Sequence, residues 1–147
     1  MLAYAFAILL VILGGLAAAA QAPINAALAR SLGSPIAAAS VSFAVGLVLL
    51  LGLTALWSGP AVVLRLPGLP LWQLAGGVLG ALYVFSMVIG VPQLGVVSAL
   101  AALIVGQMLG AMVLDSSGAF GLAVQAITPQ RILAVLMVIG GLVLSRL

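Results

Sequence analysis

The near-absence of charge along this chain constrains its fold more than any other feature. Its 147 residues include one acidic residue, Asp115, and four basic residues, all of them arginines. The stretches 31–64 and 66–114 carry no charge at all. A soluble domain has about 25% charged residues, whereas this chain has 3%, with 67% hydrophobic residues. Five charges cannot cover a surface in water, so the sequence predicts an integral membrane protein.

The same shortage of chemical groups excludes most catalysis. The chain has no cysteine and no histidine, so it lacks a thiol nucleophile and the usual ligands of a metal site. A single carboxylate cannot form an acid–base pair. We therefore predict no enzyme activity, no metal and no cofactor. The net charge of +3 comes from scattered arginines, so nucleic-acid binding is not predicted either.

Long unbroken apolar runs favour spanning helices over a barrel, whose strands alternate in polarity. A span needs roughly 20 apolar residues. Ser34-Pro35 and Thr128-Pro129 are typical helix starts, with a capping side chain before a first-turn proline. The sequence predicts one all-α transmembrane domain over residues 1–147, a bundle of about five helices, with four or six left open. The predicted helices cover residues 2–29, 35–57, 71–90, 96–114 and 129–145.

Residues 119–131 are the ambiguous part of this prediction. The apolar stretch from Phe120 to Ile127 is too short to span a membrane. It is expected either to lie at the membrane interface or to extend the last helix. Asp115 to Gly118 is predicted to form a turn. Asp115 is expected either to pair with Arg131 on the same side of the membrane or to start the turn through an Asx bond.

The arginines are balanced between the two sides of the membrane. Five helices place the chain ends on opposite sides, so that one side carries Arg65 and Arg131 and the other carries Arg30 and Arg146. An excess of basic residues normally fixes the orientation, and here there is none. Either other features decide it, or the chain inserts both ways and pairs with an inverted copy of itself. We favour the second reading, an antiparallel homodimer.

Polar side chains inside the predicted spans are candidates for a binding site. Gln21 and Asn25 share one face of the first helix, and Pro23 between them is expected to bend that helix. Polar groups are costly in lipid, so they should face inward. The amides can bind either another helix or a substrate, and both readings stay open. The candidate binding residues are Gln21, Asn25, Ser42, Tyr83 and Gln107.

Other small and polar residues in the spans favour a structural role. The serines of the spans, including Ser40, Ser86 and Ser98, are expected to bond back to their own helices. Two small-xxx-small pairs allow helices to approach closely in lipid, and we expect them to serve ordinary packing. These pairs are Gly76 with Gly80, and Gly106 with Gly110.

The order of these residues resembles a known family. The run Gln21-Ala-Pro-Ile-Asn25, followed by Leu28, Gly33-Ser-Pro35, Ser42-Phe43 and Gly46, resembles the YdcZ-like family of the drug/metabolite transporter superfamily, long catalogued as a domain of unknown function. Later segments agree over nearly the whole chain: Trp72 with Gly76-Gly77 and Gly80, Pro92-Gln-Leu-Gly95, Gly106-Gln107, and Asp115 with Gly118.

The resemblance implies a five-helix half-transporter of the bacterial inner (plasma) membrane. Such units occur as single dual-topology chains, as oppositely oriented pairs, or fused into ten-helix proteins. The small multidrug resistance proteins are distant relatives that use a glutamate in the first helix for substrate and proton. This chain has no acid there, so proton-coupled export of a cation is not carried over to it.

The sequence thus predicts a transporter for an unidentified small molecule, working by alternating access as an antiparallel homodimer in the lipid bilayer. Two alternatives stay open. The chain could be one subunit of a heterodimeric transporter with an oppositely oriented paralogue, or a membrane scaffold that transports nothing.

Overall fold

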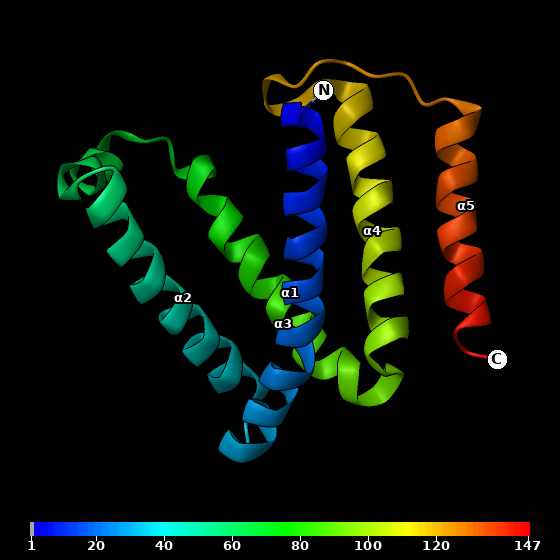
Figure 1. Cartoon of the computed structure of the whole chain (residues 1–147), viewed down its shortest axis with the longest axis horizontal. Coiled ribbons are helices and arrows are strands. Elements are labelled where there is room, and N and C mark those ends of the chain that lie inside the picture. The colour runs from blue at the N-terminus through cyan, green and yellow to red at the C-terminus, as the bar shows by residue number, and fades with distance from the viewer. Residues whose placement is uncertain (1) are drawn as a thin grey trace. The chain divides into compact units, whose positions relative to one another are not determined.

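The computed structural model describes residues 2–147, and the side chains of residues 4–59, 61–64 and 67–147. The described secondary structure is helical throughout and contains no strand (Figure 1). The chain divides into two compact units, Met1–Gln93 and Leu94–Leu147. The long helices are α1 (Leu2–Leu32), α2 (Pro35–Trp57), α3 (Ala75–Leu94), α4 (Val96–Ser117) and α5 (Pro129–Leu144), and the short 3-10 helices are η1 (Pro60–Gly68), η2 (Leu71–Leu74) and η3 (Ala119–Gly121).

The prediction of an all-α membrane protein is confirmed. Four helices, α1 to α4, are long and apolar enough to cross a membrane, and α5 is a shorter apolar helix of 16 residues. The two predicted helix starts are also confirmed. The Ser34 hydroxyl accepts a hydrogen bond from the Ala37 amide at 3.2 Å, and the Thr128 hydroxyl accepts one from the Arg131 amide at 3.4 Å.

Several predicted boundaries were wrong by a few residues. Three helices run past their predicted ends at 29, 90 and 114, because each stops only at a glycine with positive φ: Gly33 (66°), Gly95 (78°) and Gly118 (63°). Such glycines are the usual helix terminators, since they adopt the left-handed conformation without strain. The predicted turn at 115–118 is therefore mostly helix, and α3 continues through Pro92. Residues 71–74, predicted as the start of a regular helix, form η2 instead.

The ambiguous segment 119–131 neither spans nor lengthens α5. After η3, residues 122–128 are free of regular structure, and α5 begins at Pro129. The backbone N–H of Gln125 donates to the carbonyl of Asp115 at 2.9 Å, so the segment folds back over the end of α4. We call residues 118–128 the strap.

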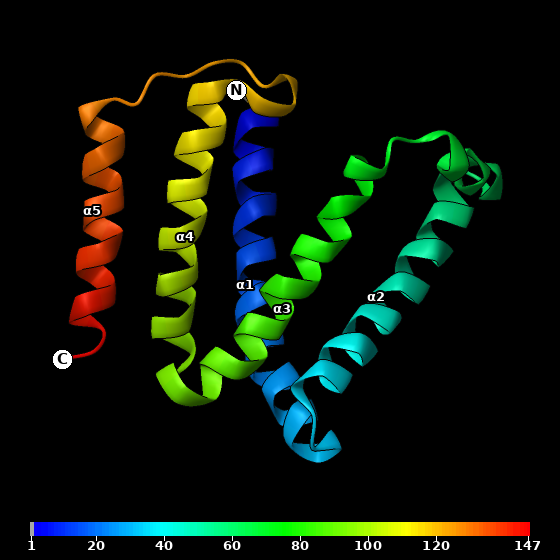
Figure 2. The same cartoon turned by 180° about the vertical axis from the view of Figure 1, so that it is seen from behind.

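In the first unit, α1, α2 and α3 pack through narrow faces of small or β-branched residues. The core joins Ala39 of α2 to Val84 and Val88 of α3, with Ala29 of α1 packed against it. Most other apolar side chains of these helices point outward, as expected for spans that face lipid on most sides. The ribbon of α1 changes direction in its C-terminal third (Figures 1 and 2), the part that contains Pro23, as proline in a helix predicts.

In the second unit, α5 runs antiparallel to α4 and is tied to it at both ends. Near one end, Arg131 Nη2 lies 3.0 Å from Asp115 Oδ2. Near the other, the hydroxyls of Ser98 and Ser145 are 3.0 Å apart. From Ser98 to Asp115, α4 rises about 26 Å, close to the hydrocarbon thickness of about 30 Å. The shorter helix α5 therefore lies along α4 over most of this length.

Candidate functional site: a groove among the first three helices

Three hollows in the first unit adjoin one another through shared lining residues. The largest, about 550 Å³, lies between α2 and α3. It shares Phe43 with a second hollow of about 290 Å³. The second hollow shares Gln21 and Val84 with a crevice beside α1 that is too narrow to hold a water molecule. We call the three together the α2–α3 groove. The residues that line its polar part are Gln21, Asn25, Ser42 and Tyr83, and those that line its apolar part include Ile36, Ala39, Phe43, Leu82 and Phe85.

The structure brings four of the five predicted binding residues to this groove. Asn25 is 5% exposed and faces the crevice together with Gln21 and Tyr83. Gln21 also faces the second hollow, where Ser42 lines the opposite wall from α2. The face shared by Gln21 and Asn25 on α1, predicted from their spacing, therefore points toward α2 and α3.

These four side chains have spare hydrogen-bonding capacity. Two neighbouring serines bond back to their own helices as predicted, Ser40 to the carbonyl of Ile36 at 3.0 Å and Ser86 to that of Tyr83 at 2.8 Å. Among the hydrogen bonds of the described side chains, none involves the side chain of Gln21, Asn25, Ser42 or Tyr83. Amide and hydroxyl groups without a protein partner can bond to a ligand, so this end of the groove is suited to a hydrogen-bonding ligand.

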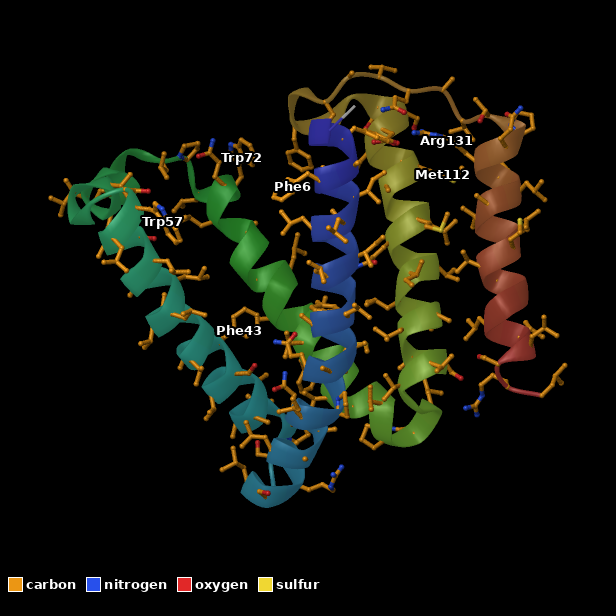
Figure 3. The ribbon with its side chains drawn as sticks, viewed as in Figure 1. Phe6, Phe43, Trp57, Trp72, Met112 and Arg131 are labelled. Carbon is orange, nitrogen blue, oxygen red and sulfur yellow. The ribbon has the colours of Figure 1, made fainter. Side chains whose placement is uncertain are left out.

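The apolar end of the groove was not predicted from the sequence. Phe43 extends from α2 toward α3 (Figure 3). Its Cζ would lie 3.5 Å from a Cβ at position 80, so Gly80 leaves room for the ring to lie against the backbone of α3. Phe85 lines the same hollow from α3. A periodicity argument cannot separate these rings from lipid-facing ones, because the helices are apolar on all sides.

Gln107 is not part of this groove. It is exposed on α4, in the second unit, and lines none of the hollows described here.

The predicted glycine pairs also differ from one another. Gly80 meets Phe43, whereas a Cβ at Gly76, Gly106 or Gly110 would have no such neighbour within 4 Å. For those three glycines, the expected role in packing stays a prediction.

A smaller hollow, of about 170 Å³, lies between α4 and α5 beside Asp115 and Arg131. The predicted ion pair between these residues is present, with side chains 29% and 32% exposed. Arg131 also donates to the side-chain carbonyl of Gln125 in the strap.

The prediction for Ser98 was wrong: its hydroxyl bonds to Ser145 at the end of the neighbouring helix and not to its own helix, because the α4–α5 contact brings a second hydroxyl within reach.

The charged pair does not resemble a metal site. Within the part of the chain that the structure describes, no three residues of the types His, Cys, Asp and Glu come together. The pair instead ties the strap to the ends of α4 and α5.

Comparison with known proteins gives one family. The family model described as "Putative inner membrane exporter, YdcZ" matches residues 6–144. A curated relative, the inner membrane protein YdcZ of Escherichia coli (strain K12), is 29% identical over 75 residues, which is 51% of this chain and 50% of that protein. The match thus spans about half the length of this relative. No solved structure matches the chain.

Proposed function

The chain belongs to the YdcZ family of inner membrane exporters, and from this premise we propose that it carries a small molecule across the inner membrane as an antiparallel homodimer. The substrate binds in the α2–α3 groove, near the membrane midplane. Gln21 precedes Arg30 by nine residues, or about 14 Å of helix. If Arg30 lies at the headgroups, Gln21 is close to the middle of a hydrocarbon core of about 30 Å.

The observation that carries this proposal is the buried Asn25 amide. The residue is 5% exposed, and its side chain lies beside Gln21 of α1 and Tyr83 of α3, in a helix that is mostly apolar. A polar amide in a membrane-spanning helix is unusual, which makes it a candidate for function. A bound substrate satisfies its hydrogen bonds. Polar residues on a spanning helix can bond to a neighbouring helix or recognise a substrate, and we assign these to recognition.

The inverted pairing rests on the balance of arginines. In the first unit, Arg30 lies near the α1–α2 turn, and Arg65 follows the far end of α2. In the second, Arg131 and Arg146 lie near opposite ends of α5. Each unit thus contributes one arginine to each membrane surface. In an inverted dimer, exchanging the conformations of the two copies opens the site to the other side, which gives alternating access.

Cysteine labelling tests the orientation. The chain has no native cysteine, so Ser58→Cys and Leu147→Cys each introduce a single reactive thiol. We expect a membrane-impermeant maleimide added to intact cells to label part of each population, and the remainder to react only after the membrane is permeabilised. If each position reacts completely from one side only, the dual-topology dimer is wrong. A paralogue of opposite orientation then becomes the better partner.

A thermal-shift screen of metabolites tests the site. A ligand that binds only the folded protein raises its melting temperature. We expect a hit that loses its effect in Asn25→Leu and keeps it in the matched control Gln93→Leu, whose amide bonds to its own helix at the Ile89 carbonyl. Loss of the dimer in Asn25→Leu would instead assign the amide to packing and favour a scaffold.

A further inference from the structure

The α2–α3 groove has a polar end and an apolar end that meet at one residue. Phe43 lines both the large hollow and the second hollow. On one side of it, Gln21 and Ser42 supply an amide and a hydroxyl. On the other side, the walls are the side chains of Ile36, Leu82 and Phe85 with small alanines. A ligand that fills both hollows must therefore be amphiphilic.

The large hollow offers a ligand almost no hydrogen bonding. Its one polar side chain is Ser40, whose hydroxyl proton is already donated to the Ile36 carbonyl. The volume of about 550 Å³ falls within the range of pockets for small organic molecules, about 300–1,000 Å³. Aromatic rings on its walls favour stacking with a flat or branched apolar group.

The lining of the groove also contains no charged side chain among the described residues. A cation or an anion in such a groove would lose its hydration without gaining a partner, which is strongly unfavourable. The amides and hydroxyls at the polar end can both donate and accept hydrogen bonds. They match the uncharged head of an amide, an alcohol or a similar group.

We propose that the site takes a neutral amphiphile, with its apolar body between Phe43 and Phe85 and its uncharged hydrogen-bonding head at Gln21 and Ser42, next to Asn25. This inference rests on the proposed function, since it names the substrate class of the same groove. Ile36 and Leu82 are 66% and 63% exposed, so the apolar hollow is open at its side. The body of the substrate therefore enters from the hydrocarbon phase, and the head follows into the groove.

Three probes that share one ring system test the substrate class: 2-naphthamide, its anionic analogue 2-naphthoate, and a cationic 2-naphthyl trimethylammonium. Each is radiolabelled and titrated against the full chain in nanodiscs, with empty nanodiscs subtracted for partitioning. We expect saturable binding of 2-naphthamide and at least about tenfold weaker binding of both ions, a difference in free energy that one unpaired charge readily exceeds.

Variants of the groove test the assigned ends. Phe43→Ala and Asn25→Leu should each weaken 2-naphthamide binding by about tenfold. The matched controls Phe6→Ala, at a ring 66% exposed on α1, and Gln93→Leu should leave it unchanged. Phe43→Leu retains apolar bulk and keeps the test usable if the alanine variant fails to fold.

Three results would overturn the inference. The first is equal or tighter binding of either ion, which would reject the neutral class while leaving transport through the groove intact. The second is 2-naphthamide binding that is unaffected by Phe43→Ala, Phe43→Leu and Asn25→Leu. The third is no saturable binding of 2-naphthamide. Failure of the proposed function itself is read separately, from the cysteine labelling, which does not depend on any ligand.

Discussion

At three positions in this chain, the missing side chain of a glycine or the missing hydrogen bond of an amide shapes the local structure. Gly80 has no side chain, and the ring of Phe43 lies against the backbone there. Asn25 has no hydrogen-bond partner among the described side chains, which is one reason for proposing that it contributes to a binding site. Gly118 has a left-handed backbone with φ of 63°, and a Cβ at this position would lie 2.7 Å from Val124 Cγ2. An added methyl group at Gly80 or Gly118, or an added hydrogen bond at Asn25, would change the local structure.

Gly118→Ala should destabilise the second unit, because the new methyl group combines backbone strain with a clash against the strap. We expect a loss of about 1–3 kcal/mol, the usual size of a strained left-handed residue. Thermal unfolding in detergent measures it. The control is Gly141→Ala in α5, where a Cβ has no neighbour within 4 Å and alanine favours the helix. Equal melting temperatures for the two variants would contradict the strained geometry.

Among the helices, α5 depends most on its neighbour. It is 16 residues long, whereas α4 has 22. Its position is fixed by polar links at both ends, and by the Arg146 guanidinium, whose Nη1 donates to the carbonyl of Leu94 at 3.1 Å. In lipid there is no hydrophobic drive to bring two helices together, so these end contacts help to set the pairing.

A disulfide tests the pairing of α4 and α5 directly. The hydroxyls of Ser98 and Ser145 are 3.0 Å apart, a separation that two cysteines at these positions can bridge with small adjustments. We expect Ser98→Cys with Ser145→Cys to form an intramolecular disulfide on mild oxidation, detected by peptide mapping. Ser117→Cys with Ser145→Cys is the control, because these residues lie at opposite ends of the helix pair. Cross-linking of the control pair and not of the first would reject the antiparallel arrangement.

The ion pair at the other end should contribute modestly. Asp115 and Arg131 are each about a third exposed, at 29% and 32%, so solvent screens their attraction. A double-mutant cycle with Asp115→Ala and Arg131→Ala should give a coupling of about 0.5–1 kcal/mol, typical of exposed or partly exposed pairs. Chemical unfolding in detergent provides the four free energies. A coupling indistinguishable from zero would mean that Gln125, which also accepts from Arg131, holds the arginine equally well alone.

At the scale of the whole molecule, the proposed inverted dimer depends on how the four arginines are distributed over the two membrane surfaces. A chain with so few charges has little to guide its insertion. One added positive charge should therefore be enough to tip the orientation.

Ser31→Lys and Ser58→Lys place one extra charge on opposite sides, at the end of α1 and after α2. We expect each variant alone to show a single orientation by cysteine labelling. Co-expression of the two should restore both orientations. Ser31→Gln and Ser58→Gln serve as neutral controls. If each lysine variant still reacts from both sides, arginine balance does not determine the orientation.

The sequence by itself determined the helical membrane fold and most of its divisions. The starts of α2 and α5 could be predicted from two residues each, Ser34-Pro35 and Thr128-Pro129, because a capping hydroxyl and a first-turn proline act locally. Spacing alone put Gln21 and Asn25 on one face, because the helix repeat fixes which side chains are neighbours. Helix ends were less certain, because Arg30 and Pro92 each look like stop signals while the chain continues to the next left-handed glycine.

Only the tertiary structure decided which helices share a site. It brought Ser42 and Tyr83 to the face of α1 that carries Gln21, left Gln107 outside the groove, and made Phe43 the residue between polar and apolar ends. It likewise joined Ser98 to Ser145 across 47 positions. The physical reason is that these helices are apolar on every side. Their sequences therefore have no amphipathic pattern that would distinguish the face toward the core from the face toward the lipid. The packing of small residues against one another determines which face of each helix points toward the core.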